Sequence, residues 1–481
     1  MRGREDIARN MRIPIVFATD NHYLFYTCVA ITSLAEHAAK DTFYSIFLLM
    51  GEETQEARNW IKRLNQTYPK IHVESMLVDT KALAKAKIWN SHVTKATFYR
   101  LLLDHMLGEE KCIYLDSDII VTEDVSELYQ IEVGEHYLAG CRDIWIDLMS
   151  MEQKENRRLK TGIPSMDSYI NAGVLVMNLK KIREDQLQSQ FLTHLEKKYP
   201  YEDQDILNVC CYGKILKIPQ KWNIFTLFMG QIQEMRKQGI EEGVCQAFQE
   251  KAGILHYATP FIRPWERYGC WANKEWWDMA AIWKEEKDYL AVKEKVEQVE
   301  QQYTWQYYID RCRQYQAICI FGFTRYGKEL CRWIQKMEGN RELYFCDNQK
   351  EKQGEDYRGV PVYSFEEVRK KQENRLFFIA SQGRKEEIKN MLLDSGIEEK
   401  HILWYQAKTK EYYEYLDKRY YQKEWEEIVF KEGYCLQKGE SRKEAAKKWF
   451  LLPEYKEWAE TYYLDRWIGK EWEGVCQKYP Y

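Results

Sequence analysis

Two aspartates separated by one residue, Asp116 and Asp118, follow a short apolar run at 112–115 that is rich in strand-forming side chains. Side chains two residues apart in a strand point to the same face, so the two carboxylates are expected to lie side by side. Their mutual repulsion would be relieved by a hard divalent cation such as Mg²⁺ or Mn²⁺. Such a cation, held by few protein ligands, keeps positions open for a diphosphate. The alternative for an isolated Asp-X-Asp is an ordinary polar turn.

Strands and helices alternate around this pair. Alternation of this kind predicts a mostly parallel α/β sheet. Ligands of such sheets bind beyond the carboxyl ends of strands, where the aspartates are expected. Strands are predicted at 13–18, 44–50, 71–78, 112–115, 172–178 and 254–258, and helices after residue 23, at 53–66, at 97–106 and from Asp203.

Length and composition narrow the function classes. A chain of 481 residues is longer than one core usually serves, so two or three domains are expected. The formal charge of −4 gives no electrostatic basis for a nucleic-acid partner. The 13 cysteines include no Cys-x-x-Cys pair, which favours a reducing compartment. The N-terminus lacks the apolar core of a signal peptide, so a cytoplasmic location is expected.

Changes in composition predict four regions. An α/β domain is expected at 13–285, a charged, Gln-rich helical linker at 286–312, a smaller α/β domain at 313–407 and an aromatic-rich helical tail at 408–481. The tail is charge-balanced, which favours a packed helical appendage. The alternative is peripheral contact with the inner face of an anionic membrane.

Four more stretches accompany the aspartate pair, at 17–23, 97–100, 169–174 with 203–205, and 256–265. Their order and spacing closely resemble glycosyltransferase family 8, which includes glycogenin and bacterial lipooligosaccharide galactosyl- and glucosyltransferases. The resemblance covers roughly residues 13–270 and implies the GT-A fold. It also implies transfer of a hexose, with retention of anomeric configuration, from UDP-glucose or UDP-galactose to a glycan or lipid-linked acceptor. The implied cofactor is Mn²⁺, with Mg²⁺ as the alternative.

The resemblance also implies a metal site and a donor site. Asp116, Asp118 and His256 would be the metal ligands, and imidazole suits Mn²⁺ as well as carboxylate does. The alternative for His256 is an ordinary hydrogen-bonded histidine at a strand end, and the alternative for Arg100 is a solvated helix face. Asp203, Gln204 and Arg263 would be catalytic. The residues implied to bind the nucleotide-sugar are Ala18, Asp20, Tyr23, Arg100, Asp116, Ser117, Asn171, Ala172, Asp203, Gln204 and Arg263.

The family pattern is broken after His256. The loop to Trp265 is one residue longer, lacks a glycine and carries Arg263 where lysine is usual. Arginine can still neutralise a leaving diphosphate, whereas the missing glycine argues against a close backbone contact with a phosphate.

Retention of configuration needs either front-face attack or a covalent intermediate. Gln204 is a poor nucleophile, so front-face attack is expected, with a covalent route through Asp203 as the alternative. Acceptor contacts are expected from the loops at 143–168 and 223–250.

The second α/β region contains a rival site. Gly322 and Gly327 follow a predicted strand and Asp347 closes the next one, which resembles a dinucleotide-binding fingerprint in a Rossmann-like domain. Thr324 replaces the middle glycine, and this argues against tight NAD binding. Two alternative functions remain: an NAD-dependent nucleotide-sugar oxidoreductase or epimerase acting through residues 317–407, and a degenerate protein that only binds nucleotide-sugar. The alternative for this region is an interaction or scaffolding module that binds no nucleotide.

Overall fold

The chain forms two compact units, each with its own sheet, and the main division falls between Val292 and Lys293. The predicted tail, 408–481, lies outside the residues that the structure describes. The computed structural model describes residues 12–88, 94–230, 232–259, 263–266, 272–301, 305–337, 341–371, 374–381 and 384–405.

The first unit is built on a seven-stranded mixed sheet. One of its inner strands is β1 (Arg12–Ala18), in which residues 13–17 are all buried, as expected for a strand covered on both faces. The β1 strand pairs in parallel with β2 and β4, whereas β7 runs antiparallel to both β4 and β6. The strand order is β3 (Ile71–Leu77), β2 (Phe43–Met50), β1, β4 (Cys112–Leu115), β7 (Ile170–Met177), β6 (Leu138–Arg142) and β8 (Ile215–Lys217).

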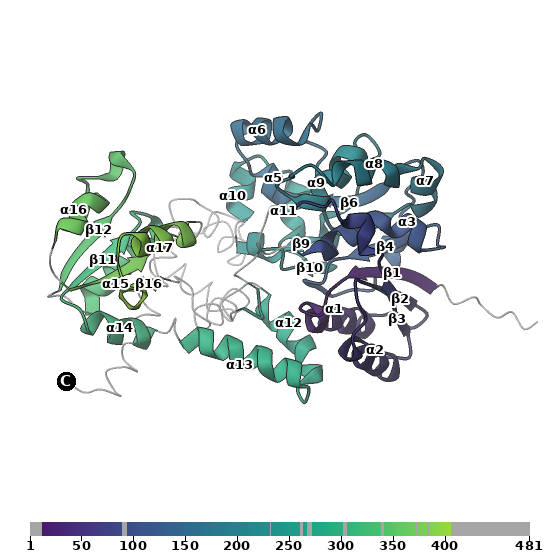
Figure 1. Ribbon diagram of the computed structural model, residues 1–481, viewed down its shortest axis with the longest axis horizontal. Coiled ribbons are helices and arrows are strands. Elements are labelled where there is room, and N and C mark those ends of the chain that lie inside the picture. Colours follow the sequence, from purple (N-terminus) through teal and green to yellow (C-terminus); the bar gives the residue numbers. More distant parts are fainter. Residues whose placement is uncertain are drawn as a thin grey trace, which may run out of the picture. The chain divides into compact units, whose positions relative to one another are not determined.

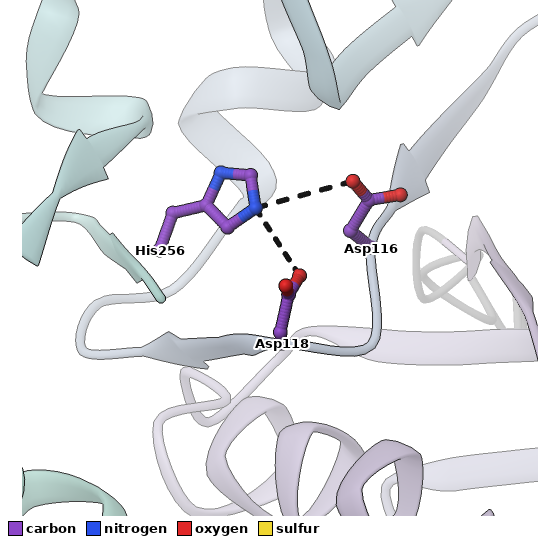
Figure 2. Close-up of side chains that lie close together, drawn as sticks. All are labelled: Asp116, Asp118 and His256. Carbon is purple, nitrogen blue, oxygen red and sulfur yellow. Dashed lines mark hydrogen bonds and ion pairs between the residues drawn. The ribbon is translucent and has the colours of Figure 1, made fainter. Parts of the chain in front are cut away.

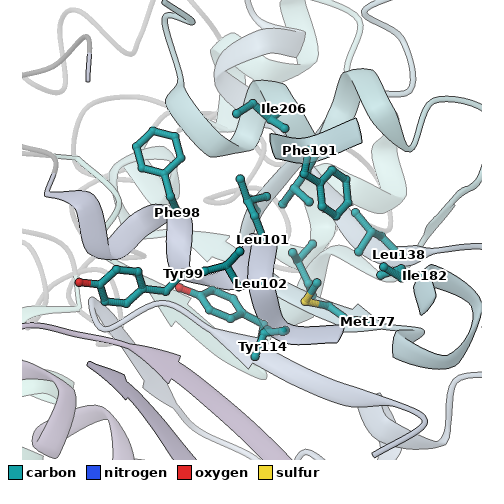
Figure 3. Close-up of a cluster of buried hydrophobic side chains, with 14 of the residues drawn as sticks. Phe98, Tyr99, Leu101, Leu102, Tyr114, Leu138, Met177, Ile182, Phe191 and Ile206 are labelled. Atoms are coloured by element: carbon teal, nitrogen blue, oxygen red, sulfur yellow. The ribbon is translucent and has the colours of Figure 1, made fainter. Parts of the chain in front are cut away.

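Helices cover both faces of this sheet (Figure 1). The helices α1 (Leu24–Glu36) and α2 (Gln55–Thr67) lie on one side. The other side carries α7 (Leu179–Glu184), α8 (Leu187–His194) and α9 (Glu202–Cys210). Apolar side chains from these helices and from the strands fill the core beneath them (Figure 3). The remaining helices of the unit are α3 (Leu103–Met106), α4 (Ser126–Gln130), α5 (Ile144–Asp147), α6 (Met151–Thr161), α10 (Ile232–Lys237), α11 (Glu242–Ala247) and α12 (Asn273–Ala280).

The helix predicted at 97–106 differs from the structure. A 3₁₀ helix spans Lys95–Leu102, and only α3, Leu103–Met106, is α-helical. Side-chain hydrogen bonds compete with regular helix formation in this stretch, because Arg100 Nε donates to the carbonyl of Thr97 and the Thr97 hydroxyl donates to Asp203.

A small three-stranded sheet carries the chain from the aspartate pair to the histidine. It consists of β5 (Ile119–Val121), β10 (Ile254–His256) and β9 (Ile224–Phe225). The β5 and β10 strands are antiparallel, with Ile119 opposite His256. This register sets His256 beside the residue that directly follows Asp118.

The second unit has a six-stranded sheet. All its pairings are parallel except that of β13 with β14. The predicted linker at 286–312 contains α13 (Lys287–Gln301) and α14 (Trp305–Arg313), and α14 contributes Tyr308 and Cys312 to the core of this unit. The strand order is β13 (Asp356–Tyr357), β14 (Val360–Tyr363), β12 (Glu342–Cys346), β11 (Ala317–Phe321), β15 (Arg375–Ile379) and β16 (Ile402–Trp404), and the further helices are α15 (Arg325–Met337), α16 (Phe365–Lys370) and α17 (Lys385–Asp394).

Among the described residues of both units, we find no helix that combines the length and the apolar character needed to cross a membrane.

Candidate active site

Asp116 and Asp118 lie in the short connection between β4 and β5, at the carboxyl end of β4. His256, the last residue of β10, approaches both of them (Figure 2). Its Nε2 is 3.2 Å from Asp118 Oδ1 and 3.9 Å from Asp116 Oδ2. One ligand atom from each residue lies within 4.8 Å of those of the other two. The structure therefore brings together the three residues that the sequence analysis assigned to a metal.

The surroundings of this trio fit a divalent cation. Two carboxylates and one imidazole form a donor set that suits Mn²⁺. Gly173 on β7 supplies the space, because a Cβ atom there would lie 2.3 Å from His256 Cε1 and 2.9 Å from Asp116 Oδ2. Only glycine leaves this side of the trio open without displacing a ligand.

Arg100 is buried and faces the site, contrary to the alternative of a solvated helix face. Its Nη2 donates to Asp116 Oδ1 at 2.8 Å, and its Nε lies 2.9 Å from Asp203 Oδ2. Its Nη1 donates to the carbonyl of Ala172, and the guanidinium lies over the ring of Tyr114. Burial lowers the pKa of Arg100, but the two carboxylates outweigh burial and raise it. The side chain therefore stays charged and orients Asp116.

Asp203 lies in the first turn of α9, as its predicted helix start suggested, and is 4% exposed. The Thr97 hydroxyl donates to its Oδ1, and its Oδ2 forms the ion pair with Arg100. Burial raises the pKa of Asp203 to about 6, although Arg100 and the Thr97 hydrogen bond oppose this rise. Asp203 Oδ1 thus accepts a hydrogen bond, whereas the buried Oδ2 is ion-paired with Arg100 but accepts no hydrogen bond from the described residues.

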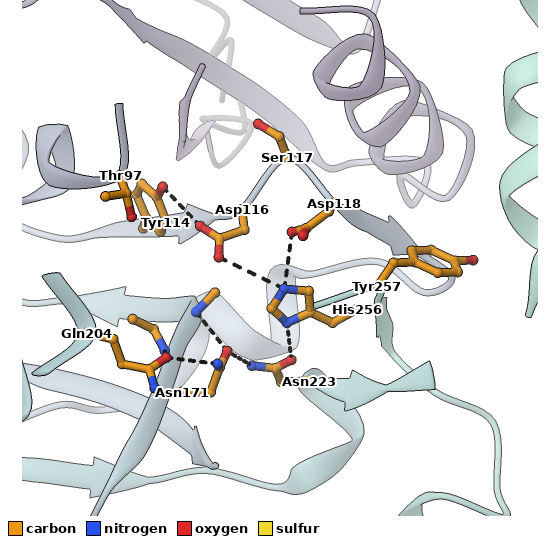
Figure 4. A network of polar contacts seen from close by, with 12 residues as sticks. Thr97, Tyr114, Asp116, Ser117, Asp118, Asn171, Gln204, Asn223, His256 and Tyr257 are labelled. Atoms are coloured by element: carbon orange, nitrogen blue, oxygen red, sulfur yellow. Dashed lines mark hydrogen bonds and ion pairs between the residues drawn. The ribbon is translucent and has the colours of Figure 1, made fainter. Parts of the chain in front are cut away.

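A chain of side-chain amides lies beside the trio (Figure 4). Gln204 Oε1 accepts hydrogen bonds at 2.9 Å from Asn171 Nδ2 and from the backbone N–H of Ala172. Gln204 Nε2 donates to Asp143 Oδ2 at 2.9 Å. Asn171 Oδ1 accepts from Asn223 Nδ2 at 2.8 Å. The predicted residues Asn171, Ala172 and Gln204 are therefore one hydrogen-bonded group.

The stretch after β1 supplies the other predicted donor-site residues. Ala18 ends β1, and its carbonyl accepts from Ser117 Oγ at 3.2 Å. Asp20 Oδ1 accepts from the backbone N–H groups of His22 and Tyr23, each at 3.0 Å. These bonds hold Tyr23 at the start of α1, close to the aspartate connection.

Arg263 reaches the trio from the altered loop. Its Nη2 donates to Asp118 Oδ2 at 2.9 Å, its Nη1 to the hydroxyl of Tyr23 at 2.7 Å, and its Nε to the carbonyl of Tyr257 at 2.9 Å. The loop after His256 therefore brings a cation to the aspartate pair. Residues 260–262 of this loop lie outside the described part of the chain.

Two residues of the site were missed by the sequence analysis. Asp143 caps α5 and accepts from Gln204, and burial raises its pKa against these hydrogen bonds. Asn223 is fully buried between Asn171 and His256. Neither residue lies in a recognisable motif. Asp143 directly follows β6, a strand that was not predicted from the sequence, and Asn223 carries no local signal.

The glycine-containing loop of the second unit has the backbone that its sequence indicates. Gly322 has a φ of +115°, and a Cβ atom on Gly327 would lie 2.1 Å from the carbonyl oxygen of Gly322. The Thr324 hydroxyl accepts from the backbone N–H of Gly327, and Asp347 Oδ2 accepts from that of Phe323. Two backbone N–H groups of this loop thus donate to side chains. Nucleotide binding at this loop stays a prediction.

Known proteins resemble the first unit. A putative glycosyltransferase of Haemophilus influenzae is 30% identical over 218 residues, which cover 44% of this chain and 62% of that protein. This chain thus spans less than two thirds of that relative. A lipopolysaccharide 1,2-glucosyltransferase of Escherichia coli is 26% identical over 274 residues, or 54% of this chain and 76% of that protein.

The structure of the bifunctional glycosyltransferase WbbM in its apo form matches with a TM-score of 0.51 at 20% identity. The match covers 62% of this chain and 53% of that one, and it supports the mixed, parallel-rich GT-A architecture predicted from the sequence. The family model described as glycosyl transferase family 8 matches residues 14–269. The chain therefore belongs to glycosyl transferase family 8.

Proposed function

We propose that the chain is a retaining hexosyltransferase that takes glucose or galactose from a UDP-sugar and depends on Mn²⁺. The observation that carries this proposal is the convergence of Asp116, Asp118 and His256 beyond the carboxyl end of β4, with the guanidinium of Arg263 beside them. In such a site a divalent cation supplies Lewis-acid stabilisation of the diphosphate leaving group.

In this proposal, the UDP-sugar binds against the side chains that surround this trio. We assign the uracil ring to Tyr23, whose hydroxyl accepts from Arg263, and the uracil imide N–H to Asp20. We place the hexose beside Asn171, Ala172, Asp203 and Gln204. Their mutual hydrogen bonds hold them in fixed orientations before the sugar arrives, which favours precise positioning.

Departure of UDP leaves negative charge that Arg263 is placed to stabilise. An arginine can donate through two nitrogens to neighbouring oxygens, and this one already donates to Asp118 through Nη2. Both oxygens of Asp203 are engaged by Thr97 and Arg100, which supports front-face attack over a covalent Asp203 intermediate. The acceptor hydroxyl then attacks from the face that the leaving group vacates, and its proton passes to the departing phosphate oxygen.

The two loops expected to hold the acceptor meet near the site. The indole of Trp145, two residues after Asp143, contacts Phe228 edge-on with ring centroids 5.0 Å apart. Phe228 is stacked on Phe225, which in turn contacts the ring of His256. Trp145 is 40% exposed, so its free surface offers a sugar a flat apolar platform at the end of this ladder of rings. The lipopolysaccharide named for the Escherichia coli relative supports a glycan or lipid-linked acceptor.

Calorimetric titration with UDP-glucose and UDP-galactose, each with and without Mn²⁺, tests the donor and the metal together. We expect micromolar binding that requires Mn²⁺ and that is stronger for one of the two sugars. Asp118→Ala should abolish the Mn²⁺-dependent binding while the protein stays folded. Glu123→Gln is the matched control, because the ion pairs of Glu123 with described residues are to Lys221 and Lys251 and to no member of the trio. Metal-independent binding, or none, would contradict the proposal.

A further inference from the structure

We propose that Asn223 is a positioning residue that keeps the proton of the His256 imidazole on Nδ1, so that the lone pair of Nε2 faces Asp116 and Asp118. The inference rests on the metal site of the proposed function and adds a residue to it. The side chain of Asn223 has no described hydrogen bond to Asp116 or Asp118, and its described hydrogen-bond partners are Asn171 and His256.

The direction of each hydrogen bond follows from the backbone. The peptide N–H of Gly173 lies 2.9 Å from one side-chain atom of Asn171, and because a peptide N–H can only donate, that atom is the oxygen Oδ1. The same oxygen is 2.8 Å from the Asn223 amide, which must therefore present its NH₂ group. The Asn223 oxygen then faces His256 Nδ1 at 2.9 Å, and an amide oxygen can only accept. The proton consequently sits on Nδ1.

A second peptide N–H fixes the same orientation of the Asn171 amide, starting from Gln204. The N–H of Ala172 donates to Gln204 at 2.9 Å, which identifies that atom as the oxygen Oε1. This oxygen also lies 2.9 Å from Asn171, which must present its Nδ2 there. The two successive peptide groups thus fix the Asn171 amide independently. Turning any amide of the chain over would set two donors or two acceptors against each other.

The position of the proton matters because of what faces the other ring nitrogen. His256 Nε2 is 3.2 Å from Asp118 Oδ1 and 3.9 Å from Asp116 Oδ2, and carboxylates at these distances favour a proton on Nε2. A proton there would occupy the lone pair that a cation needs. Asn223 offers the competing acceptor on the opposite side of the ring. When the Asn223 oxygen accepts from Nδ1, the lone pairs of Asp116, Asp118 and His256 Nε2 converge on one point. A cation bound there would stabilise this arrangement.

The segment that contains Asn223 also restricts movement of the His256 imidazole ring. Phe225, two residues after Asn223, contacts the imidazole edge-on at 5.2 Å, and it pairs with His256 across β9 and β10. Asn223 is 0% exposed and His256 2%, so bulk water cannot replace the amide oxygen if Asn223 is removed. Loss of the amide would leave Nδ1 without this acceptor.

Mn²⁺ titration, followed by the electron paramagnetic resonance of free Mn²⁺, tests the inference in the full chain without any sugar. Asn223→Leu removes the acceptor, and we expect Mn²⁺ affinity to fall by about 10–100-fold. Asn223→Asp keeps an oxygen toward Nδ1 but repels Asn171 Oδ1. It should therefore lower the thermal midpoint while keeping Mn²⁺ affinity within about threefold of the unsubstituted protein, as a carboxylate partner supports a ligating histidine.

Asn178→Leu is the matched control. Asn178 caps α7 just beyond the other end of β7, and its side-chain amide donates to the carbonyls of Gly134 and His136. Its loss should lower stability without changing Mn²⁺ affinity. Unchanged affinity in Asn223→Leu would overturn the inference. An equal loss in the Leu and Asp variants would also overturn it, because the role would then be to hold Asn171. If the unsubstituted chain binds no Mn²⁺, the proposed metal itself fails and this inference with it.

Discussion

The guanidinium of Arg263 donates to the carboxylate of Asp118 at 2.9 Å, although the two residues are 145 positions apart in the chain. The same side chain donates to the hydroxyl of Tyr23 at 2.7 Å. One arginine therefore links the carboxylate proposed to hold the metal with the ring proposed to hold uracil. A phosphate group that bridges these two regions would meet Arg263 first.

Replacing Arg263 should impair transfer, more severely in an alanine variant than in a lysine variant. Arg263→Ala removes the charge beside the leaving group, and we expect kcat to fall by about 10²–10³-fold, the usual cost of losing one preorganised donor. Arg263→Lys keeps the charge but cannot make all three contacts, so an intermediate kcat is expected. UDP release in the steady state measures both. Arg58→Ala, which removes a surface ion pair with Glu53, should leave the rate unchanged. Full activity of Arg263→Ala would contradict the role.

Gly173→Ala should prevent metal binding. The added Cβ would lie 2.3 Å from His256 Cε1, far inside normal contact distance, so the imidazole must move away from the aspartates. We expect the loss of Mn²⁺-dependent UDP binding in calorimetry with the sheet intact by circular dichroism. Gly108→Ala is the control, because no described atom outside its own chain neighbours lies within 4 Å of the Cβ position there. Normal Mn²⁺ binding by Gly173→Ala would place the ion elsewhere.

Asp203 should make stability depend on pH. Its pKa of about 6 in the folded protein is above the value of about 3.9 for an unperturbed aspartate, so the folded state holds the proton more tightly. Its contribution is therefore present at about pH 4 and is lost as pH rises through about 6, at a cost of about 3 kcal/mol.

Asp203→Asn cannot ionise and should escape this loss. The free energy of unfolding of the variant, relative to that of the unsubstituted protein, is expected to increase between pH 4 and pH 7 by about 2 kcal/mol. Denaturant titrations of both proteins at the same ionic strength measure the difference. A difference that does not vary with pH would show that the Asp203 carboxyl titrates near its ordinary value.

Trp145→Ala should weaken acceptor binding and leave donor binding unchanged. Loss of the exposed indole is expected to raise the acceptor KM by up to about tenfold, the range of one aromatic contact. Hydrolysis of the UDP-sugar by water should continue at its original rate. A panel of disaccharide acceptors and a UDP-release assay separate the two activities. Ile282→Ala, which truncates a side chain that is 41% exposed, serves as the control. Equal loss of hydrolysis and transfer would assign Trp145 to the donor site instead.

How far the sequence predicts the site depends on how local each signal is. Asp116 and Asp118 directly end an apolar strand, so their type, spacing and position are all readable from adjacent residues. Asn223 carries no such signal, because its role comes from Asn171 and His256, which are 52 and 33 positions away.

The elements show the same contrast. Strand β1 was predicted nearly to its ends because five successive buried residues leave few other interpretations. The 3₁₀ helix at Lys95–Leu102 was predicted as α-helix, and its contacts include one from Thr97 to Asp203, more than a hundred residues later, which adjacent residues do not reveal.

The pairing of Ile119 with His256 has a consequence for how the loop that follows can change. His256 is placed by strand register, and a shift of one residue would turn its side chain to the opposite face. Residues added after His256 leave that register untouched and lengthen only the path to Arg263. Insertions downstream of His256 therefore leave the arrangement of Asp116, Asp118 and His256 intact, whereas a single insertion between Gly253 and His256 would remove the imidazole from it. The extra residue that the family resemblance implies after His256 lies on the tolerant side of that boundary.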